Sequence, residues 1–555
     1  MSSKPVDVVV IGSGAAGSFA ALGLTGAGAD VLMLEAGRTI TPEDFPENFA
    51  GPKEKGIQLW ARIRAALTGQ PIQSKVAFYG QQQRHLFVRD SEHPYSTPKD
   101  HPFLWIRGKQ LGGRLHVYGR VLMRWSDHDF KAASRDGYGE DWPIAYADLA
   151  PFYGRVETLL GVRGVAAGID NLPDGQFAGP SKLTAAETDF KVATEAHWPE
   201  RRATSWRYMP PNIHRVPQPI LAAQATGRLA IRSDAVVRRI LTDPATGKAT
   251  CVEFVDRTTG AVETVHAKAV MVCASPIESV RLLLNSAGGR HLPGLGNGSG
   301  MLGRCFMDQV PNLILGTVPG RTGNEVDDTV PADPFYGVSG GIYIPRWENL
   351  VAGPNPGFVR GFGYQGTIGR LFSPPGKPAK FGIMGFGEML PNPENRITLH
   401  PSRKDRWGMP IPHIDIRMRA NETAMLRAQC DAVFEMCRNA GLETEWVGSL
   451  LGLEEHGRGA FPDADAISRW LFRRNYRAGV GLGAAIHESG GARMGSDPAT
   501  SVVDGDNRLW DASNVFVTDA SSFATGGCAG TTLTVMALSL RAGEHVAREL
   551  AAGRI

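Results

Sequence analysis

A short apolar strand that runs directly into a glycine-rich turn constrains the fold of this chain more than any other feature. Val6–Ile11 has the mostly apolar pattern of a strand buried on both faces of a parallel sheet. The next residues are Gly12-Ser13-Gly14-Ala15-Ala16-Gly17, and a helical pattern continues through Leu24. A second strand, Asp30–Leu34, ends in Glu35. This order predicts a βαβ unit that binds a dinucleotide.

Each residue type in the turn has a physical reason. Gly12 permits the tight turn, Gly14 lets the backbone approach a pyrophosphate, and Gly17 lets the helix pack closely on the strand. The helix N-terminus supplies free N–H groups and a partial positive charge. Glu35 lies where a carboxylate can accept both hydroxyls of an adenosine ribose. We therefore expect the dinucleotide to contact Gly12, Gly14, Ala15, Ala16, Gly17 and Glu35.

Composition excludes several other classes of protein. The chain has 555 residues and is 42% hydrophobic, so it can bury a large core. Its 59 basic and 56 acidic residues nearly cancel, without a basic block carrying aromatics, so we expect no nucleic-acid partner. No apolar run approaches the roughly eighteen residues of a membrane span, and no signal peptide precedes the first strand, which favours a cytoplasmic protein. Six cysteines lack metal-ligand spacing, so no metal site is expected.

The middle of the chain begins with an irregular stretch. Residues 40–103 are rich in Pro, Gln and charge, and we expect them to form a long excursion that covers the cofactor. Within it, residues 56–69 could form a short amphipathic helix. Docking of its apolar face on the body is the expected use, with a partner or membrane surface as the alternative. That face carries Ile57, Trp60, Ile63 and Leu67.

Strand patterns then alternate with helices to the C-terminus. Residues 229–274 contain alternating strands, and the aromatic residues of 305–420, spaced by Gly and Pro, are typical of an antiparallel sheet walling a pocket or forming plain core. Asn514–Thr518 is another buried-strand pattern, and a helix follows from about Thr532 towards Leu550. A strand this late in the chain completes the sheet begun at residue 6, so the domains are discontinuous.

These patterns predict an α/β fold with two interleaved domains. The first is a Rossmann-like dinucleotide-binding domain formed by residues 1–190, 225–305 and 481–555. The second is an α+β substrate domain on an antiparallel sheet, formed by residues 306–480 with 191–224 contributing. The sequence Ala36-Gly37-Arg38 after Glu35 favours FAD over NAD, and the opening resembles that of flavoproteins such as glutathione reductase.

Three motifs resemble signatures of the glucose-methanol-choline family of FAD oxidoreductases. The first is Gly112-Gly113-Arg114-Leu115-His116-Val117-Tyr118-Gly119-Arg120, and the second, degenerate, is Ala274–Ser286. The third is His487-Glu488-Ser489-Gly490-Gly491-Ala492-Arg493-Met494-Gly495, followed by Asn514–Ser521 and Thr532–Thr534. Arg124–Phe130 and Asp141–Ile144 are most similar to the bacterial sugar and glucoside dehydrogenases, with pyranose oxidases more distant.

The resemblance implies the remaining cofactor contacts. Some relatives attach FAD through a histidine four positions after the Gly-Gly pair, where this chain has Val117, with His116 one residue short. We therefore expect non-covalent FAD. The expected contacts beyond the first turn are Ala36, Gly112, Gly113, Tyr118, Gly119, Val237, Ala274, Asp519, Ala520, Thr531 and Thr532.

The resemblance also implies the catalytic base. In the family, the histidine matching His487 lies beside the flavin N5–C4a edge and takes the hydroxyl proton, while hydride passes from the carbinol carbon to N5. An alcohol is a very weak acid that must lose its proton as hydride leaves, and imidazole titrates close to neutral pH. The alternative for His487 is a structural histidine at the end of a glycine-rich loop.

Two departures from the family pattern concern the substrate. Where the family has Asn or His, four residues before the threonine matching Thr534, this chain has Gly530. The hydroxyl of Thr531, or a group on another loop, would then orient the substrate oxygen, so Thr531 is a second catalytic candidate. Gly491 replaces the threonine that usually precedes Ala492-Arg493.

The sequence thus predicts an FAD-dependent alcohol dehydrogenase or oxidase. The expected substrate is a sugar or glycoside, with a bulky aromatic alcohol, such as a lignin-derived one, as the alternative. A flavin-dependent lyase of the same family, an NAD-dependent dehydrogenase and a non-catalytic flavin protein are the other possibilities. The electron acceptor is left open among oxygen, a quinone and a cytochrome, and an oligomer is compatible with this interpretation.

Overall fold

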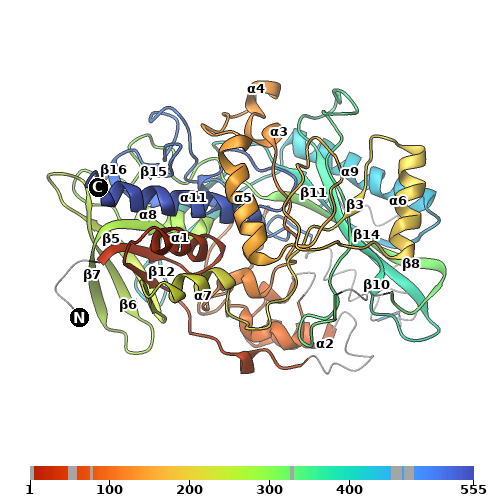
Figure 1. Cartoon of the computed structure of the whole chain (residues 1–555), viewed down its shortest axis with the longest axis horizontal. Helices are drawn as coiled ribbons and strands as arrows, with labels where there is room; N and C mark the ends of the chain where they lie inside the picture. Colours follow the sequence, from red (N-terminus) through yellow and green to blue (C-terminus); the bar gives the residue numbers. More distant parts are fainter. Residues whose placement is uncertain are drawn as a thin grey trace.

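Two large sheets at opposite ends of the molecule organise the chain (Figure 1). The structure is a computed structural model that describes residues 6–47, 59–75, 79–325, 330–451, 466–467, 470 and 480–555. The first sheet has the strand order β15-β16-β7-β1-β2-β4, and β5 and β6 join it through β7. Its strands are β1 (Val6–Ile11), β2 (Val31–Leu34), β4 (Leu229–Arg232), β5 (Ala235–Thr242), β6 (Ala249–Asp256), β7 (Val262–Val272), β15 (Arg508–Leu509) and β16 (Ala512–Val517).

The centre of the first sheet is parallel and buried on both faces. β1 pairs in parallel with β2 and β7, and β7 pairs in parallel with β16. Val8, Val9 and Val10 are fully buried, as a sheet covered by helices on both sides requires. The C-terminal strand therefore lies in the sheet begun at residue 6, and the predicted Rossmann-like topology is confirmed.

Two helices from opposite ends of the chain pack closely against each other over this sheet. α1 (Ala15–Gly26) and α11 (Thr532–Ala551) lie side by side (Figure 1). A methyl group at Gly23 would lie 2.7 Å from the backbone oxygen of Leu540, and one at Gly543 would lie 2.5 Å from that of Ala20. Glycines at both positions let the helix backbones approach where larger residues would clash. The other helices near this sheet are α5 (Tyr146–Leu160), α7 (Gln218–Ala225) and α8 (Pro276–Asn285).

The second sheet is antiparallel, as predicted for the aromatic region. Its strand order is β14-β8-β11-β10-β9-β3, with the long strands β8, β11 and β10 at its centre. Helices α6 (Ala185–His197) and α9 (Ala420–Asn439) pack on it. The strands are β3 (Thr204–Ser205), β8 (Gln309–Thr322), β9 (Ile342–Ile344), β10 (Phe362–Leu371), β11 (Pro378–Glu388) and β14 (Glu443–Gly448).

Most aromatic residues of this sheet form core. Trp347 packs edge-on against Phe362 with ring centroids 5.2 Å apart, and Tyr364 lies beside both. All three are at most 2% exposed. Phe386, near the end of β11, is the exception, because its ring packs on the imidazole of His487. The alternative that these aromatics are plain core holds for most of them.

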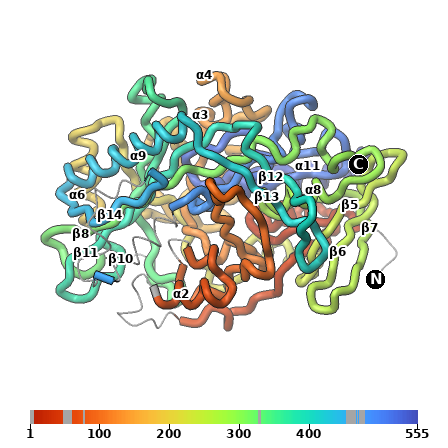
Figure 2. Tube along the Cα trace, turned by 180° about the vertical axis from the view of Figure 1, so that it is seen from behind, coloured from red at the N-terminus to blue at the C-terminus, as the bar shows by residue number. Residues whose placement is uncertain are grey.

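Shorter elements connect the two sheets. β12 (Arg396–Lys404) and β13 (Pro410–Asp415) form a ribbon that lies beside α8, visible from behind in Figure 2. Short α-helices span Asp127–Phe130 (α3) and Ala133–Asp136 (α4). Short 3-10 helices are η1 (Pro42–Asp44), η2 (Gln73–Lys75), η3 (Gln81–Leu86), η4 (Gly113–His116) and η6 (Ala520–Ser522).

The helix predicted within residues 56–69 forms, but it docks through an unexpected face. α2 (Leu59–Leu67) buries Arg62 and Ala65, which are 3% and 0% exposed. The Arg62 guanidinium donates hydrogen bonds to the backbone oxygens of Ser74 and Tyr79, at 2.9 and 3.2 Å. These bonds make burial of a charged side chain tolerable.

The predicted docking face of α2 is therefore wrong. Trp60 and Leu67 are 76% and 82% exposed, and Ile63 is only partly buried. Ile57 lies outside the described residues. The apolar spacing of this helix would place Arg62 on the solvent side. In the structure Arg62 is buried, because backbone oxygens are available to accept its hydrogen bonds.

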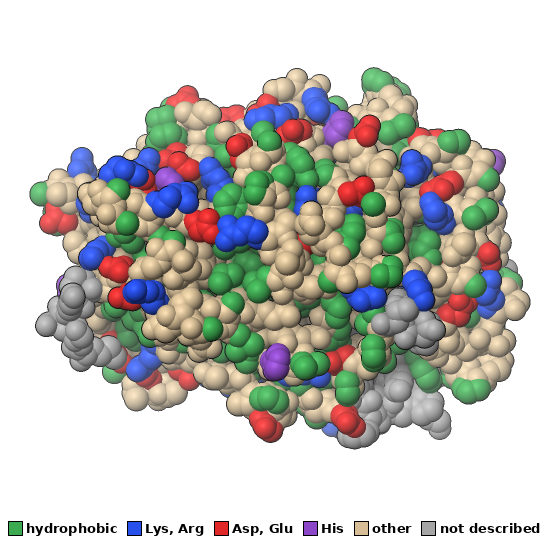
Figure 3. Space-filling view, viewed as in Figure 1, with side chains coloured by type: hydrophobic (Ala, Val, Ile, Leu, Met, Phe, Trp, Pro, Cys, Tyr) green, Lys and Arg blue, Asp and Glu red, His purple; other side chains and the backbone are tan. Residues whose placement is uncertain are grey.

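The surface carries both signs of charge. Figure 3 shows basic and acidic side chains interspersed over one face of the molecule, in keeping with the formal net charge of +3. In the part of the chain that the structure describes, none of the helices combines the length and apolarity needed to pass through a bilayer.

Candidate active site

The three glycines of the first turn occupy different environments. Gly12 has φ +100°, and a methyl group there would lie 2.6 Å from the backbone oxygen of Cys273. A methyl group at Gly17 would lie 1.8 Å from the backbone oxygen of Gly12, so the helix could not pack on the turn. A methyl group at Gly14 would meet nothing within 4 Å, because Gly14 borders a cavity. The geometry matches the turn, packing and approach functions expected of these positions.

The N-terminus of α1 is available to a ligand. Gly14 is its N-cap and offers no side-chain hydrogen bond, so the first N–H groups of the helix are not capped by a side chain. Ala15 and Ala16 line the same cavity as Gly14. Uncapped N–H groups and the helix dipole together favour an anionic group such as a pyrophosphate.

Glu35 joins the first turn to the second glycine-rich turn. Its carboxylate accepts hydrogen bonds from the backbone N–H of Gly37 at 2.8 Å and from the backbone N–H and hydroxyl of Ser13. The Ser13 hydroxyl oxygen accepts in turn from the backbone N–H of Gly112, at 2.9 Å. Burial raises the pKa of Glu35, and the bonds from Ser13 and Gly37 oppose that rise.

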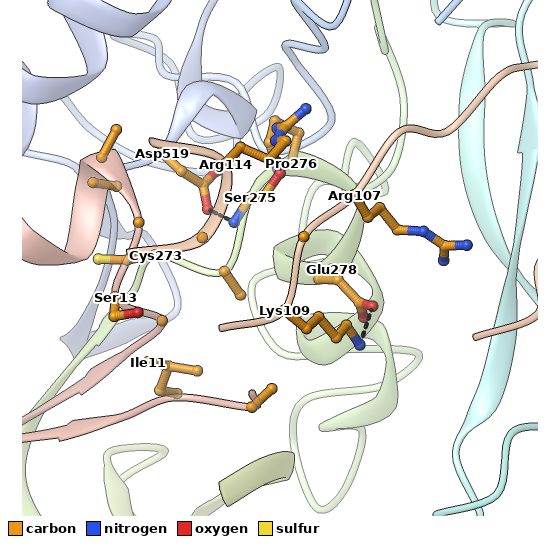
Figure 4. Close-up of a pocket in the computed structure, with 18 of the residues that line it drawn as sticks. Ile11, Ser13, Arg107, Lys109, Arg114, Cys273, Ser275, Pro276, Glu278 and Asp519 are labelled. Atoms are coloured by element: carbon orange, nitrogen blue, oxygen red, sulfur yellow. Dashed lines mark hydrogen bonds and ion pairs between the residues drawn. The ribbon is translucent and has the colours of Figure 1, made fainter. Parts of the chain in front are cut away.

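A single elongated cavity brings most of the predicted cofactor contacts together (Figure 4). Glu35, Val237, Tyr118 and Thr531 all line it. Gly17, Gly112 and Gly119 do not line it: Gly17 and Gly112 pack behind the turns, and a methyl group at Gly119 would point towards Gln365. The predicted residues that line the cavity are Gly12, Gly14, Ala15, Ala16, Glu35, Ala36, Gly113, Tyr118, Val237, Ala274, Asp519, Ala520, Thr531 and Thr532.

The wall opposite the first turn holds charged groups that we did not single out from the sequence. Lys109 Nζ lies 3.0 Å from Glu278 Oε1, an ion pair drawn in Figure 4. Burial would raise the pKa of Glu278, but Lys109 and Arg281 lower it below its ordinary value. Asp519, which was an expected contact, accepts a hydrogen bond from the backbone N–H of Ser275 at 3.0 Å. Glu278 lies within the second motif and Lys109 shortly before the first, yet pairing between distant segments leaves no local signal.

His487 lies next to this cavity in a strained loop. The preceding residue, Ile486, has φ 60°, a left-handed backbone that β-branched residues rarely adopt. The imidazole packs on Phe386 with ring centroids 5.1 Å apart, and its Nδ1 lies 2.6 Å from Gln309 Oε1. Loss of hydration, followed by the positive charge of Arg114, lowers the pKa of His487 to about 4. The ring is therefore neutral at pH 7 and can accept a proton.

Two carboxylates, those of Asp308 and Glu488, lie near His487. Asp308 accepts hydrogen bonds from the backbone N–H of Gly483 at 2.6 Å and of His487 at 3.1 Å. Burial, with the charge of Glu488, raises the pKa of Asp308 to about 7. Glu488 pairs through Oε2 with Arg114 at 2.6 Å, and its buried Oε1 has no hydrogen-bond partner among the described residues. Glu488 and Arg114 both line the cavity.

Gly530, where the family has its second polar group, lies beside the candidate base. A methyl group at Gly530 would lie 3.5 Å from His487 Nε2 and 3.9 Å from the backbone oxygen of Val121. A longer side chain at this position would thus contact the histidine directly. Thr531 precedes the first turn of α11, makes no side-chain capping bond, and lines the cavity.

The comparisons with known proteins agree with this geometry. The chain matches the GMC oxidoreductase family over residues 6–309 in an N-terminal part and 391–539 in a C-terminal part. A 2-methyl-1,2-propanediol dehydrogenase from Mycolicibacterium austroafricanum is 28% identical, over 99% of this chain and 96% of that protein. The fructose dehydrogenase large subunit of Gluconobacter japonicus is 25% identical, over 99% and 98%. A formate oxidase structure from Aspergillus oryzae, described for its FAD modification, has a TM-score of 0.63 at 15% identity, covering 100% of both chains.

Fold, cavity and relatives together define an FAD-binding oxidoreductase that acts on alcohols or sugars. The chain belongs to the GMC oxidoreductase family, as its motifs predicted. The open Gly14, the uncapped α1 N-terminus and the buried Glu35 fit the polar groups of FAD.

Proposed function

We propose that this enzyme oxidises a hydroxyl group of a sugar or glycoside, with His487 as the base. The observation that carries the proposal is a neutral imidazole whose Nδ1 is held by Gln309 and whose Nε2 lies beside Gly530. FAD, when bound, supplies the two-electron acceptor that the oxidation requires. Nε2 accepts the hydroxyl proton.

The assignment of cofactor contacts is part of the same proposal. The N-terminus of α1 and Gly14 would bind the pyrophosphate, and Glu35 would accept the ribose hydroxyls. Glu35 Oε2 already accepts two bonds from Ser13, whereas Oε1 accepts one from Gly37 and keeps a lone pair for a ribose hydroxyl. Val237 and Ala36 line the same cavity and would enclose the adenosine.

A sugar or glycoside is supported by the similarity to the fructose dehydrogenase subunit and by the room at Gly530. A bulky aromatic alcohol is the second candidate, because Phe386 packs on the His487 ring and offers an apolar surface beside the base. We also propose a reducing, cytoplasmic location, since all six cysteines are unpaired and buried.

Anaerobic mixing tests the proposed reaction. The holoenzyme is mixed with a panel of sugars, glycosides and aryl alcohols while the visible flavin absorbance is followed. Bleaching by a sugar or glycoside is the expected result, and bleaching only by aryl alcohols would replace the first candidate by the second. Reoxidation by oxygen, a quinone or a cytochrome then identifies the electron acceptor, and absence of bleaching with every alcohol would contradict alcohol oxidation.

Acid precipitation of the holoenzyme should release FAD into the supernatant. Val117 offers no nucleophile, and His116 is buried with Nε2 2.8 Å from the backbone oxygen of Leu111, outside the cavity lining. The measurement is the flavin absorbance of supernatant and pellet. Colour confined to the pellet would mean a covalent bond and would show that our assignment of the attachment position is wrong.

Replacing Thr531 by valine should lower the rate of flavin reduction by a factor of roughly 2–13, the effect of losing one neutral hydrogen bond. Its hydroxyl can orient the substrate oxygen, but it is not a base. Stopped-flow reduction and FAD affinity are measured on the same variant. A loss as severe as that of His487→Ala, with FAD still bound, would move the dominant catalytic group to this loop.

A further inference from the structure

Gln309 contacts the candidate base, yet it belongs to none of the sequence motifs. It is the first residue of β8 and is fully buried. Its Oε1 lies 2.6 Å from His487 Nδ1, and its Nε2 lies 2.9 Å from the backbone oxygens of both Gly527 and Ala529. One side-chain amide therefore links the histidine to the loop that carries Gly530.

The two backbone oxygens determine which way this amide points. A carbonyl oxygen only accepts hydrogen bonds, so the group that faces Gly527 and Ala529 must be the NH₂ group, which has two hydrogens to donate. A reversed amide would place its oxygen against both carbonyl oxygens and would lose both bonds in a buried site. Oε1 of Gln309 is consequently held towards His487.

The orientation of the amide sets the tautomer of the imidazole. Oε1 can only accept, so His487 Nδ1 must carry a hydrogen at this 2.6 Å contact. In the neutral ring Nε2 is then unprotonated. Nε2 is also the nitrogen beside Gly530, because a methyl group there would lie 3.5 Å from it. In the opposite tautomer, the lone pairs of Nδ1 and Gln309 Oε1 would face each other. Nε2 would then carry a hydrogen and could not act as a base.

The residue before Gln309 holds the backbone of the same histidine. Asp308 accepts the two N–H groups of Gly483 and His487, which keeps the intervening loop in place with Ile486 at φ 60°. Asp308 therefore fixes the backbone, while Gln309 fixes the ring. Both lie where β8 begins, on the sheet of the substrate domain, although His487 is far away in the sequence.

We propose that Gln309 is a positioning residue that keeps His487 in its Nδ1–H tautomer, with Nε2 free to take the substrate proton. The tautomer follows from the hydrogen bonds of the chain alone, whereas its catalytic consequence rests on the proposed function. Gln309 orients the ring without adding a charge. The charged groups around His487 are Arg114, Asp308 and Glu488.

The first test reads the tautomer directly and needs no substrate. Holoenzyme is labelled with ¹⁵N-histidine, and the signal missing from a His487→Asn variant identifies His487 in long-range ¹H–¹⁵N NMR spectra. The wild-type signal should be that of a neutral ring protonated at Nδ1. Gln309→Leu removes the acceptor, and the Nδ1–H signal should be lost or mixed with the Nε2–H form. Gln309→Glu keeps an oxygen opposite Nδ1 and should keep the tautomer.

The second test reads the consequence for catalysis. Gln309→Leu should lower the limiting rate of flavin reduction by about 10- to 100-fold with little change in substrate affinity, because the bond it loses strengthens once the ring is charged. Gln309→Glu should recover most of this loss. In that variant the second carboxyl oxygen should be protonated, because it faces the backbone oxygens of Gly527 and Ala529, which only accept hydrogen bonds.

Gln429 provides the matched control. It is a fully buried glutamine of α9 whose side-chain amide has no hydrogen-bond partner among the described residues. Gln429→Leu makes the same chemical change in the interior and should leave both the tautomer and the rate profile unchanged. A general loss of buried amide polarity would instead affect both variants alike.

Specific outcomes would overturn the proposal. An unchanged Nδ1–H signal in Gln309→Leu, or equal loss of rate in the Leu and Glu variants, means that Gln309 does not set the tautomer. If no alcohol reduces the wild-type flavin, the proposed function fails, while the NMR result still decides the tautomer. Should Gln309→Leu not bind FAD, Gln309→Met, which is similar in length and lacks the amide oxygen, replaces it in both tests.

Discussion

Replacing His487 by alanine should slow reduction of the bound flavin about 10²–10⁴-fold, the usual contribution of a positioned general base. FAD should remain bound, because His487 does not line the cavity that collects the cofactor contacts. Anaerobic stopped-flow reduction by the best alcohol of the panel measures the effect. A near-normal rate would remove His487 from the mechanism.

The control and the pH profile sharpen this experiment. His291 is a buried histidine bonded to the backbone oxygen of Gly247, and His291→Ala should leave the limiting reduction rate unchanged. In the wild type, His487 has a pKa lowered to about 4, so the neutral base predominates above that pH. The rate should therefore rise as the pH increases through about 4 and then level off. A rate that declines as the pH falls from 7 to 6 would show that His487 is not the titrating base.

Replacing Glu35 by alanine should weaken FAD binding by roughly ten- to a hundredfold, since losing a carboxylate acceptor costs about 1–3 kcal/mol. The rate of reduction at saturating FAD should change little, because the Glu35 carboxylate bonds to Ser13 and Gly37 and not to His487. The dissociation constant is obtained by titrating apoprotein with FAD and following flavin fluorescence. Unchanged affinity would mean that the ribose is held elsewhere.

Glu35 also bonds to Ser13 and Gly37, so a structural effect must be separated from a binding effect. Glu35→Gln retains one acceptor oxygen and should lose less affinity than Glu35→Ala. Glu43→Ala removes an exposed glutamate from the same segment and should change nothing. Thermal unfolding of each apoprotein reports how much of the loss comes from the turn itself.

Local sequence patterns were sufficient to predict the elements that are set by neighbouring residues. The apolar run Val6–Ile11, the turn at Gly12 and the acid Glu35 predicted β1, α1 and β2 in their observed order. Buried-strand periodicity also identified β16 as a late member of the first sheet. These predictions succeed because sheet strands and tight turns are set by short-range sterics and apolar spacing.

Patterns failed where a polar group found partners far away in the sequence. Arg62 entered the interior because Ser74 and Tyr79 present backbone oxygens to it, and the predicted docking face of α2 was lost. Lys109 and Glu278 form an ion pair in the cavity wall, although neither residue was singled out in the sequence. No spacing rule relates such segments.

His487 shows both what a sequence pattern can predict and what it cannot. Its motif alone identified His487 and the gap at Gly530, because residue type and order within a short segment carried that information. Which ring nitrogen is free was decided only when the start of β8 in the antiparallel sheet brought Gln309 and Asp308 against the loop. A tautomer depends on the hydrogen-bond partner of the other nitrogen, and here that partner comes from a distant segment, so the tertiary structure alone could determine it.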